Sequence, residues 1–274
     1  MSPPPVLLHG FTGAPESWAE VRQRLEGRDD TRAPRPPDGA ASPDSPDRGT
    51  GRFRPVLAPA GLGHDGTAGP PGIDRFEDEV DRLAAAIRQD DPRPRHLAGY
   101  SLGARVGLGL LVRHPALFRS ATLIGANPGL TDPAEREDRA ARDERWARLL
   151  ETEGLDTFVA AWEALPLFAT QEALPGDTLD RQRRIRRSHD PRGLARSLRV
   201  AGLARMPDYR SRLGDIDVPV RVIAGARDAK FRALASEMAE RLPRAALTLV
   251  PDAGHNVVLE RPTEIAALLR EDMA

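Results

Sequence analysis

Cysteine is absent from the 274-residue chain, which excludes disulfide bonds, thiolate metal sites and cysteine nucleophiles together. Aromatic residues make up only 4% of the chain, so its core must be built mainly from Ala, Leu, Val and Ile. No run of about 18 apolar residues occurs, so the sequence predicts no membrane-spanning helix. The formal net charge is −1, so no overall basic field exists to attract nucleic acid or a membrane surface.

The N-terminal residues Met1 to Pro5 have neither the basic nor the apolar region of a secretory signal. We therefore expect a cytoplasmic protein without a nucleic-acid or membrane partner. Residues 28–52 differ from the rest of the chain, because they contain five Pro and no apolar side chain larger than Ala. Such a segment cannot bury enough apolar surface to offset the entropy lost on ordering. We predict a disordered or flexible loop there.

Apolar runs typical of buried strands alternate with helical patterns, which predicts a mostly parallel six-stranded sheet with helices on both faces. The strands are expected near residues 6, 55, 97, 122, 222 and 248. A long polar, helical stretch at 127–212 separates the fourth strand from the fifth. We expect it to form a helical cap inserted after the fourth strand, while residues 1–126 and 213–274 form the core.

The segment from Gly99 to Gly103 reads Gly-Tyr-Ser-Leu-Gly and matches the G-x-S-x-G pattern of the α/β-hydrolase nucleophile elbow. It follows an expected strand at 96–98 and opens an expected helix at 101–113, which is the context that this pattern requires. Larger side chains two residues before and after the serine would collide with the neighbouring backbone. The pattern favours Ser101 as a nucleophile over an ordinary glycine-rich turn.

A serine hydroxyl needs a neighbouring base to become reactive, and the base needs a carboxylate to orient it. Asp228 follows the fifth expected strand and His255 follows the sixth, so both emerge at the sheet edge where Ser101 lies. Asp252 is a rival acid, but it lies only three residues before His255. We therefore predict a triad of Ser101, His255 and Asp228. The other five histidines lack such a position: His9, His64, His96, His114 and His189.

An oxyanion hole in this fold combines the backbone N–H after the nucleophile with an N–H from an early strand-to-helix loop. Here these donors would be Leu102 and Phe11, the latter in the Leu-His-Gly-Phe-Thr-Gly loop that ends the first strand. Arg105 lies one helical turn after Ser101 on the same helix face. A guanidinium there suits a carboxylated substrate, although an arginine that turns out towards a surface acid is the alternative.

The chain resembles the family of 2-succinyl-6-hydroxy-2,4-cyclohexadiene-1-carboxylate synthases of menaquinone biosynthesis, within the α/β-hydrolase superfamily. The resemblance rests on the elbow with Arg105, on the Phe11 loop followed by Trp18, and on residues 225–235. The expected cap adds further matching positions: Arg136, Arg139, Asp143, Arg145, Trp146, Trp162 and Phe168. The loop from Gly61 to Gly66 and Val258 depart from the family pattern. Many α/β hydrolases begin with an antiparallel hairpin, which five residues before Val6 cannot supply.

The resemblance implies a lyase that eliminates pyruvate from 2-succinyl-5-enolpyruvyl-6-hydroxy-3-cyclohexene-1-carboxylate without a metal or cofactor. Its small anionic substrate, a polycarboxylate, would be bound by Tyr100, Arg105, Arg139, Trp162, Phe168 and Arg187. Two alternatives stay open. One is a carboxylesterase or carbon–carbon bond hydrolase with the same triad. The other is a non-catalytic binding protein on this scaffold, although such proteins usually lose a triad member. The sequence leaves the oligomeric state undetermined.

Overall fold

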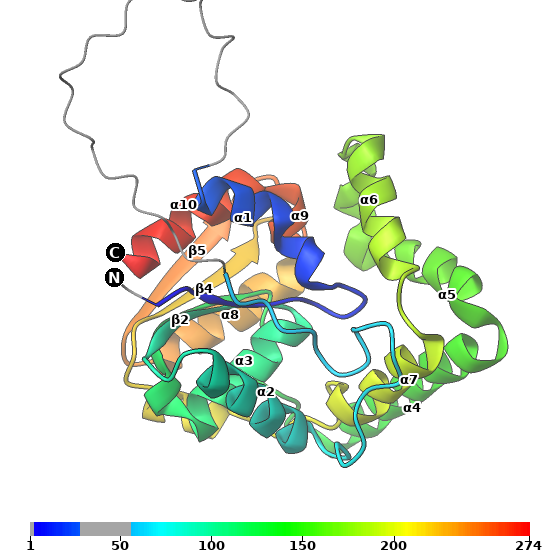
Figure 1. Cartoon of the computed structure of the whole chain (residues 1–274), viewed down its shortest axis with the longest axis horizontal. Coiled ribbons are helices and arrows are strands. Elements are labelled where there is room, and N and C mark those ends of the chain that lie inside the picture. Colours follow the sequence, from blue (N-terminus) through cyan, green and yellow to red (C-terminus); the bar gives the residue numbers. More distant parts are fainter. Residues whose placement is uncertain (1–2, 28–55) are drawn as a thin grey trace, which may run out of the picture.

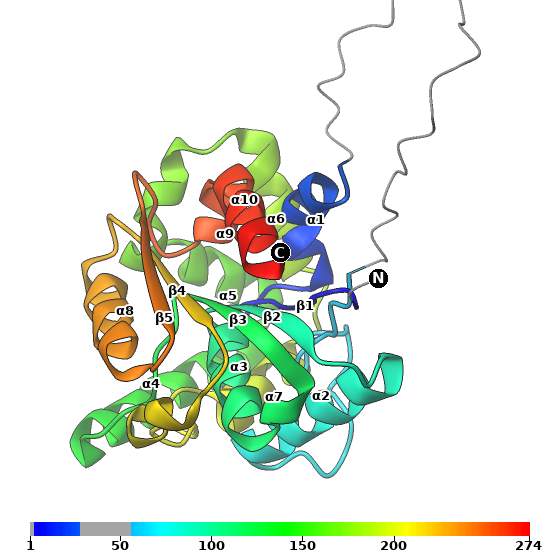
Figure 2. The same cartoon turned by 90° about the vertical axis from the view of Figure 1, so that its left-hand side faces the viewer.

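The protein is described by a computed structural model that covers residues 3–27 and 56–274. Within these ranges, five strands form one parallel sheet in which spatial order follows chain order (Figures 1 and 2). The strands are β1 (Val6–Leu8), β2 (Arg95–Tyr100), β3 (Phe118–Ile124), β4 (Val220–Gly225) and β5 (Ala245–Val250).

The expected six-stranded sheet therefore has five strands in the described part of the chain. Most of the strand expected near residue 55 lies outside the described residues. Its end, Leu57, forms an isolated parallel bridge with Val6 at the free edge of β1. The Leu7 N–H donates to the Leu57 carbonyl at 2.8 Å, so the chain does reach the predicted position beside β1. The insert expected at 28–52 also lies outside the described residues.

Helices cover both faces of the sheet, as the alternation of apolar strands and helices predicted (Figure 2). Leu7 packs with α1 (Ala19–Leu25), α9 (Val257–Glu260) and α10 (Pro262–Met273) on one face. Its neighbours Val6 and Leu8 pack with the helices of the other face, because successive side chains of a strand point in opposite directions. These helices are α2 (Phe76–Asp90), α3 (Leu102–Arg113) and α8 (Ala229–Arg241).

A helical segment lies between β3 and β4 and occupies the right-hand side of Figure 1. It contains α4 (Pro133–Thr152), α5 (Gly154–Glu163), a 3-10 segment (Pro166–Ala173), α6 (Gly176–Arg186) and α7 (Pro191–Ala201). Asp132 and Asp190 begin α4 and α7 by accepting hydrogen bonds from backbone N–H groups, and each precedes a proline that suits the first helical position.

The helical segment has its own apolar cluster, which includes Phe158, Val159, Leu194 and Leu198. Residues that follow α7 pack instead into the core beneath the sheet: Leu203, Met206, Tyr209 and Leu213. The division of the chain at residues 127 and 212 stays a prediction. Across residues 3–27 and 56–274, no helix is both long enough and apolar enough to cross a membrane.

Candidate active site

Ser101 stands on a sharp turn between β2 and α3. Its backbone has φ +53° and ψ −107°, a left-handed conformation that is strained for a residue with a side chain. The Ser101 N–H donates to the Ile124 carbonyl at 2.8 Å, which ties the turn to β3. A Cβ atom on Gly99 would lie 2.5 Å from the Gly103 carbonyl oxygen, and one on Gly103 would lie 2.2 Å from that of Leu8. The elbow therefore requires glycine at both positions, as its sequence pattern predicts.

His255 lies within hydrogen-bond distance of both other residues of the predicted triad. His255 Nε2 is 3.0 Å from Ser101 Oγ, and His255 Nδ1 is 3.1 Å from Asp228 Oδ2. The other oxygen of Asp228 accepts from the Phe231 N–H at 3.1 Å, so the carboxylate also begins α8. This arrangement can remove a proton from Ser101 and stabilise the resulting imidazolium.

Burial by itself would raise the pKa of Asp228. The hydrogen bond from His255 and the hydrogen bond from the Phe231 N–H outweigh burial and hold this pKa below its ordinary value. The rival acid Asp252 is 66% exposed and pairs with Arg227 at 2.6 Å. The geometry thus places Asp228, and not Asp252, against the histidine.

The predicted oxyanion-hole donors lie beside the serine. Phe11 and Leu102 line a cavity together with Ser101 and His255. In the described part of the chain, neither the Phe11 N–H nor the Leu102 N–H has a hydrogen-bond acceptor. Two unpaired donors near a nucleophile are suited to bind an oxygen that gains negative charge, and their role in this chain stays a prediction.

Sequence reasoning missed two buried histidines that hold the Phe11 loop. His64 donates from Nδ1 to the Leu62 carbonyl at 2.8 Å and accepts the Thr12 N–H at Nε2, 3.2 Å away. His189 from the cap lies 3.2 Å from the Thr12 carbonyl and donates to it through Nε2. Thr12 has φ +62°, so these bonds hold a strained residue directly after Phe11.

A third histidine, His9, packs against His64 with ring centroids 5.0 Å apart. It donates from Nδ1 to the Gly10 carbonyl and accepts the Gly61 N–H at Nε2. Burial lowers the pKa of His9 to about 4 and that of His64 well below its ordinary value. Both rings are therefore neutral at pH 7, which their acceptor role requires. The only sequence signal for this cluster was a histidine beside each of two glycine-rich loops.

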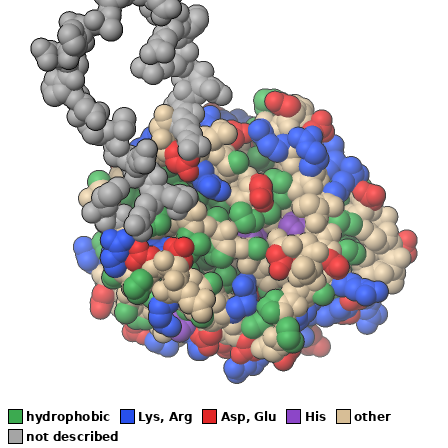
Figure 3. Space-filling model, viewed as in Figure 1, with side chains coloured by type: hydrophobic (Ala, Val, Ile, Leu, Met, Phe, Trp, Pro, Cys, Tyr) green, Lys and Arg blue, Asp and Glu red, His purple; other side chains and the backbone are tan. Residues whose placement is uncertain are grey.

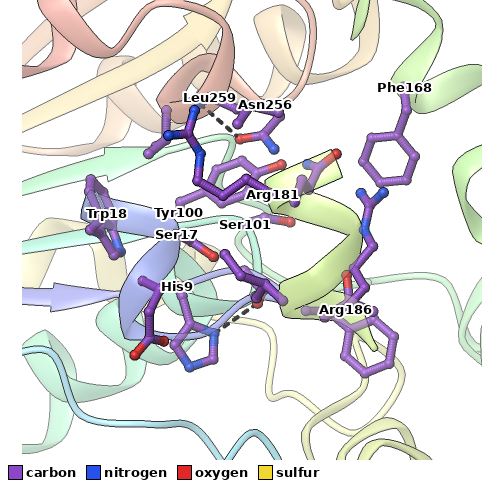
Figure 4. Close-up of a pocket in the computed structure, with 18 of the residues that line it drawn as sticks. His9, Ser17, Trp18, Tyr100, Ser101, Phe168, Arg181, Arg186, Asn256 and Leu259 are labelled. Carbon is purple, nitrogen blue, oxygen red and sulfur yellow. Dashed lines mark hydrogen bonds between the residues drawn. The ribbon is translucent and has the colours of Figure 1, made fainter. Parts of the chain in front are cut away.

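The cavity around Ser101 has two chambers, which share Phe11, Trp162, Leu167 and His255 in addition to the serine. The Tyr100 chamber lies between the core and α6 (Figure 4). It is lined by Trp18, Tyr100, Phe168, Arg181, Arg186 and Val258, among others. The polar side chains that line the Arg105 chamber include Arg105, Asn127, Arg139 and Ser197. The nucleophile therefore lies where the two chambers meet.

The structure brings Arg105 and Arg139 into one chamber, although one lies on the elbow helix and the other on α4. Arg105 Nη1 donates to the Ala201 carbonyl at 2.8 Å, and Arg139 Nε pairs with Asp143 Oδ1 at 2.8 Å. Burial and the charge of Arg139 lower the pKa of Arg105 to about 9. The two guanidiniums thus share a single neighbouring carboxylate, and the chamber favours an anion.

The structure places three of the remaining predicted substrate-binding residues, Tyr100, Trp162 and Phe168, on the cavity wall. It does not bring Arg187 there, because the Arg187 side chain is 50% exposed and pairs with Asp156 at 2.7 Å. Arg186 lines the Tyr100 chamber instead. Its side chain is 4% exposed and its guanidinium lies 5.2 Å from the Phe168 ring centroid. Side chains at neighbouring helix positions point about 100° apart, so Arg186 faces the cavity while Arg187 faces away from it.

Basic side chains also gather on the surface near the cavity. In Figure 3, Lys and Arg side chains cluster over the region that α6 occupies in Figure 1, and the arginines that α6 exposes, fully or in part, are Arg181, Arg183 and Arg184. Such a cluster would attract an anionic ligand towards the cavity. Among the described residues, no group of three or more His, Asp or Glu side chains is arranged to hold a metal ion.

The parallel sheet, the strained serine turn and the Ser–His–Asp geometry define an α/β hydrolase. A sequence model described as the alpha/beta hydrolase family matches residues 6–268, and the chain belongs to this family. Within it, the chain belongs to the family of 2-succinyl-6-hydroxy-2,4-cyclohexadiene-1-carboxylate synthases, as the sequence resemblance predicted.

The relatives cover nearly the whole chain. A protein from Bacillus subtilis (strain 168) is 33% identical over 268 residues, which are 97% of this chain and 88% of the relative. The 2-succinyl-6-hydroxy-2,4-cyclohexadiene-1-carboxylate synthase of Enterobacter sp. (strain 638) is 30% identical and covers 97% of this chain and 90% of its own length. The solved structure of MenH from S. aureus has a TM-score of 0.85 and 24% identity, and covers 99% of this chain and 93% of that chain.

Proposed function

We propose that the protein is a cytoplasmic, cofactor-free lyase of menaquinone biosynthesis. It eliminates pyruvate from 2-succinyl-5-enolpyruvyl-6-hydroxy-3-cyclohexene-1-carboxylate and forms 2-succinyl-6-hydroxy-2,4-cyclohexadiene-1-carboxylate. The observation that carries this proposal is the juxtaposition of a formed triad with two arginines in the adjoining chamber. A nucleophile beside a cationic chamber suits a polycarboxylate better than a neutral ester.

The triad would act in this reaction as a base. His255, oriented by Asp228, accepts the Ser101 proton, and the serine oxygen then removes the proton from the ring carbon next to the succinyl ketone. The electron pair of that C–H bond forms the enolate of the succinyl ketone. The enolate then forms a new ring double bond, the existing ring double bond shifts, and the bond between the ring carbon and the enolpyruvyl oxygen breaks. Enolpyruvate leaves with that oxygen and becomes pyruvate when its CH2 carbon takes up the proton held by His255. This restores the neutral histidine, while the proton taken from the ring carbon restores the Ser101 hydroxyl. No acyl-enzyme forms.

Negative charge develops on the succinyl ketone oxygen as the proton leaves. The unpaired N–H groups of Phe11 and Leu102 would stabilise this oxygen. Arg105 and Arg139 would bind a carboxylate of the substrate, while Tyr100, Trp162 and Phe168 shape the space around the ring. Arg186, which lines the Tyr100 chamber, would bind the substrate in place of Arg187.

The competing function is a carboxylesterase or carbon–carbon bond hydrolase, which the same triad and the same N–H donors would serve. The test gives purified protein the cyclohexene substrate and follows pyruvate release with a coupled dehydrogenase. A small neutral ester such as p-nitrophenyl acetate is measured in parallel, and Ser101→Ala is the control for both. We expect rapid, Ser101-dependent pyruvate release and little ester turnover. Ester turnover without pyruvate release would establish the competing function instead.

A further inference from the structure

Ser197 carries a buried hydroxyl group for which the fold supplies no partner. It lies in the middle of α7, is 2% exposed, and its Oγ makes no hydrogen bond in the described part of the chain. Burying a hydroxyl without a hydrogen bond destabilises a folded protein, so buried hydroxyls are nearly always paired. An unpaired one on the wall of a cavity points to a ligand that supplies the missing partner.

The position of Ser197 shows which ligand group this would be. Ala201 follows it by one helical turn, and the Ala201 carbonyl accepts the hydrogen bond from Arg105 Nη1 at 2.8 Å. Positions four apart lie on the same helix face, so Ser197 faces the chamber close to the point where Arg105 meets α7. Arg139 and Asn127 line the same chamber.

The charges of this chamber favour an anion. Arg105 and Arg139 bring two positive charges, and Asp143, which pairs with Arg139, is the neighbouring carboxylate. A carboxylate ligand has about four lone-pair positions. Arg105 and Arg139 each use part of their guanidinium on a protein partner. At least one lone-pair position of the carboxylate therefore stays open for a further donor, and a hydroxyl group can fill it.

We propose that Ser197 donates a hydrogen bond to the substrate carboxylate that Arg105 and Arg139 bind, and so completes a carboxylate subsite in the Arg105 chamber. This inference rests on the proposed function, which supplies the polycarboxylate. Ser197 contacts the substrate away from the reacting carbon. Its bond forms equally in the ground state and in the transition state, so it contributes to affinity rather than to turnover.

A purely structural role for Ser197 makes different predictions. The residue also borders a smaller, mostly apolar cavity with Leu83, Val106 and Leu102, and a structural role there would require only a small side chain. Ser197→Ala keeps that size and removes the hydroxyl. It therefore separates the hydrogen bond from the packing.

The matched control is Ser120→Ala, which removes a buried hydroxyl that is fully paired. Ser120 Oγ lies 2.8 Å from His96 Nδ1 and donates to the Asp272 carbonyl at 3.2 Å. It lies near the start of β3, whose opposite end reaches the elbow. Removing it should lower Tm by about 2–4 °C and leave KM unchanged.

Two measurements test the proposal: steady-state pyruvate release, and calorimetric binding of succinate as a free dicarboxylate probe. For Ser197→Ala we expect KM for the cyclohexene substrate and Kd for succinate to rise about 10-fold, with kcat within about twofold of wild type. The Tm of the free variant should equal or exceed that of wild type, because an unpaired hydroxyl has been removed.

Unchanged KM and Kd in Ser197→Ala would overturn the proposal, and so would a fall in Tm as large as that of Ser120→Ala. Failure of the proposed function would look different, since wild type would then release no pyruvate. The succinate measurement would still decide whether Ser197 belongs to a carboxylate subsite.

Discussion

Replacing Arg139 with alanine is the sharpest test of how the site binds its substrate. Arg139 lies in the Arg105 chamber and pairs with Asp143 at 2.8 Å as an i,i+4 pair on α4. Losing a charge-assisted pair to a substrate carboxylate should cost about 2–4 kcal/mol of transition-state binding. That corresponds to a fall of roughly 30- to 1000-fold in kcat/KM for pyruvate release.

The same variant should also lose stability for a reason unrelated to substrate. Asp143 is buried, and its Oδ2 already has no hydrogen-bond partner. Removing Arg139 leaves the whole carboxylate unpaired, which should cost about 1–3 kcal/mol. The double variant Arg139→Ala, Asp143→Asn removes the unpaired charge and should recover part of the Tm without recovering kcat/KM. Thermal unfolding and kinetics of both variants separate the two effects.

Arg148→Ala supplies the matched control. Arg148 lies on the same helix and forms the same kind of i,i+4 pair, with Glu144 at 3.1 Å, but its side chain is 73% exposed. We expect its removal to change stability by at most about 0.5 kcal/mol and to leave the kinetics unchanged. The reasoning would be refuted if Arg139→Ala and Arg148→Ala had equally small effects on pyruvate release.

The remaining predictions concern the triad and the Phe11 loop. Ser101→Ala and His255→Ala should each lower kcat by at least about 1000-fold, and the double variant should be no worse, since the residues act as one unit; a Ser101→Ala enzyme within tenfold of wild type would remove the triad from the mechanism. His64→Ala should lower kcat about 10- to 100-fold with little change in KM, because it frees the strained residue beside the Phe11 N–H; a change confined to KM would contradict this role. Because the pKa of Asp228 is held below its ordinary value of 3.8, its ionised form stabilises the fold above about pH 4 and this contribution is lost at lower pH. The stability difference between wild type and Asp228→Asn, measured by urea unfolding, should therefore shrink as the pH falls below about 4; a gap that stays constant down to pH 2 would show that the carboxylate charge does not contribute.

The sequence alone was sufficient to predict the features of the fold and of the site that depend on local geometry. An elbow needs glycine two residues before and two residues after Ser101, because the backbone of α3 packs closely against the backbones of β1 and β2. Parallel strands direct the residues that follow them to one sheet edge, so Asp228 and His255 could be assigned to the same site as Ser101. The alternation of apolar strands and helices likewise predicted the layers of the fold, although only a single bridge at Leu57 represents the strand expected near residue 55 in the described residues.

Tertiary structure decided whatever depends on the exact direction of a side chain or on a partner far away in the chain. One step along α6 separates Arg186, which lines the cavity, from Arg187, which faces solvent, and no sequence pattern sets that rotation. His64 and Thr12 meet across 52 residues, in a contact that no local pattern records. Whether the hydroxyl of Ser197 has a partner depends on every element packed around α7. Local chemistry can be inferred from neighbouring residues, whereas such pairings exist only once the chain has folded.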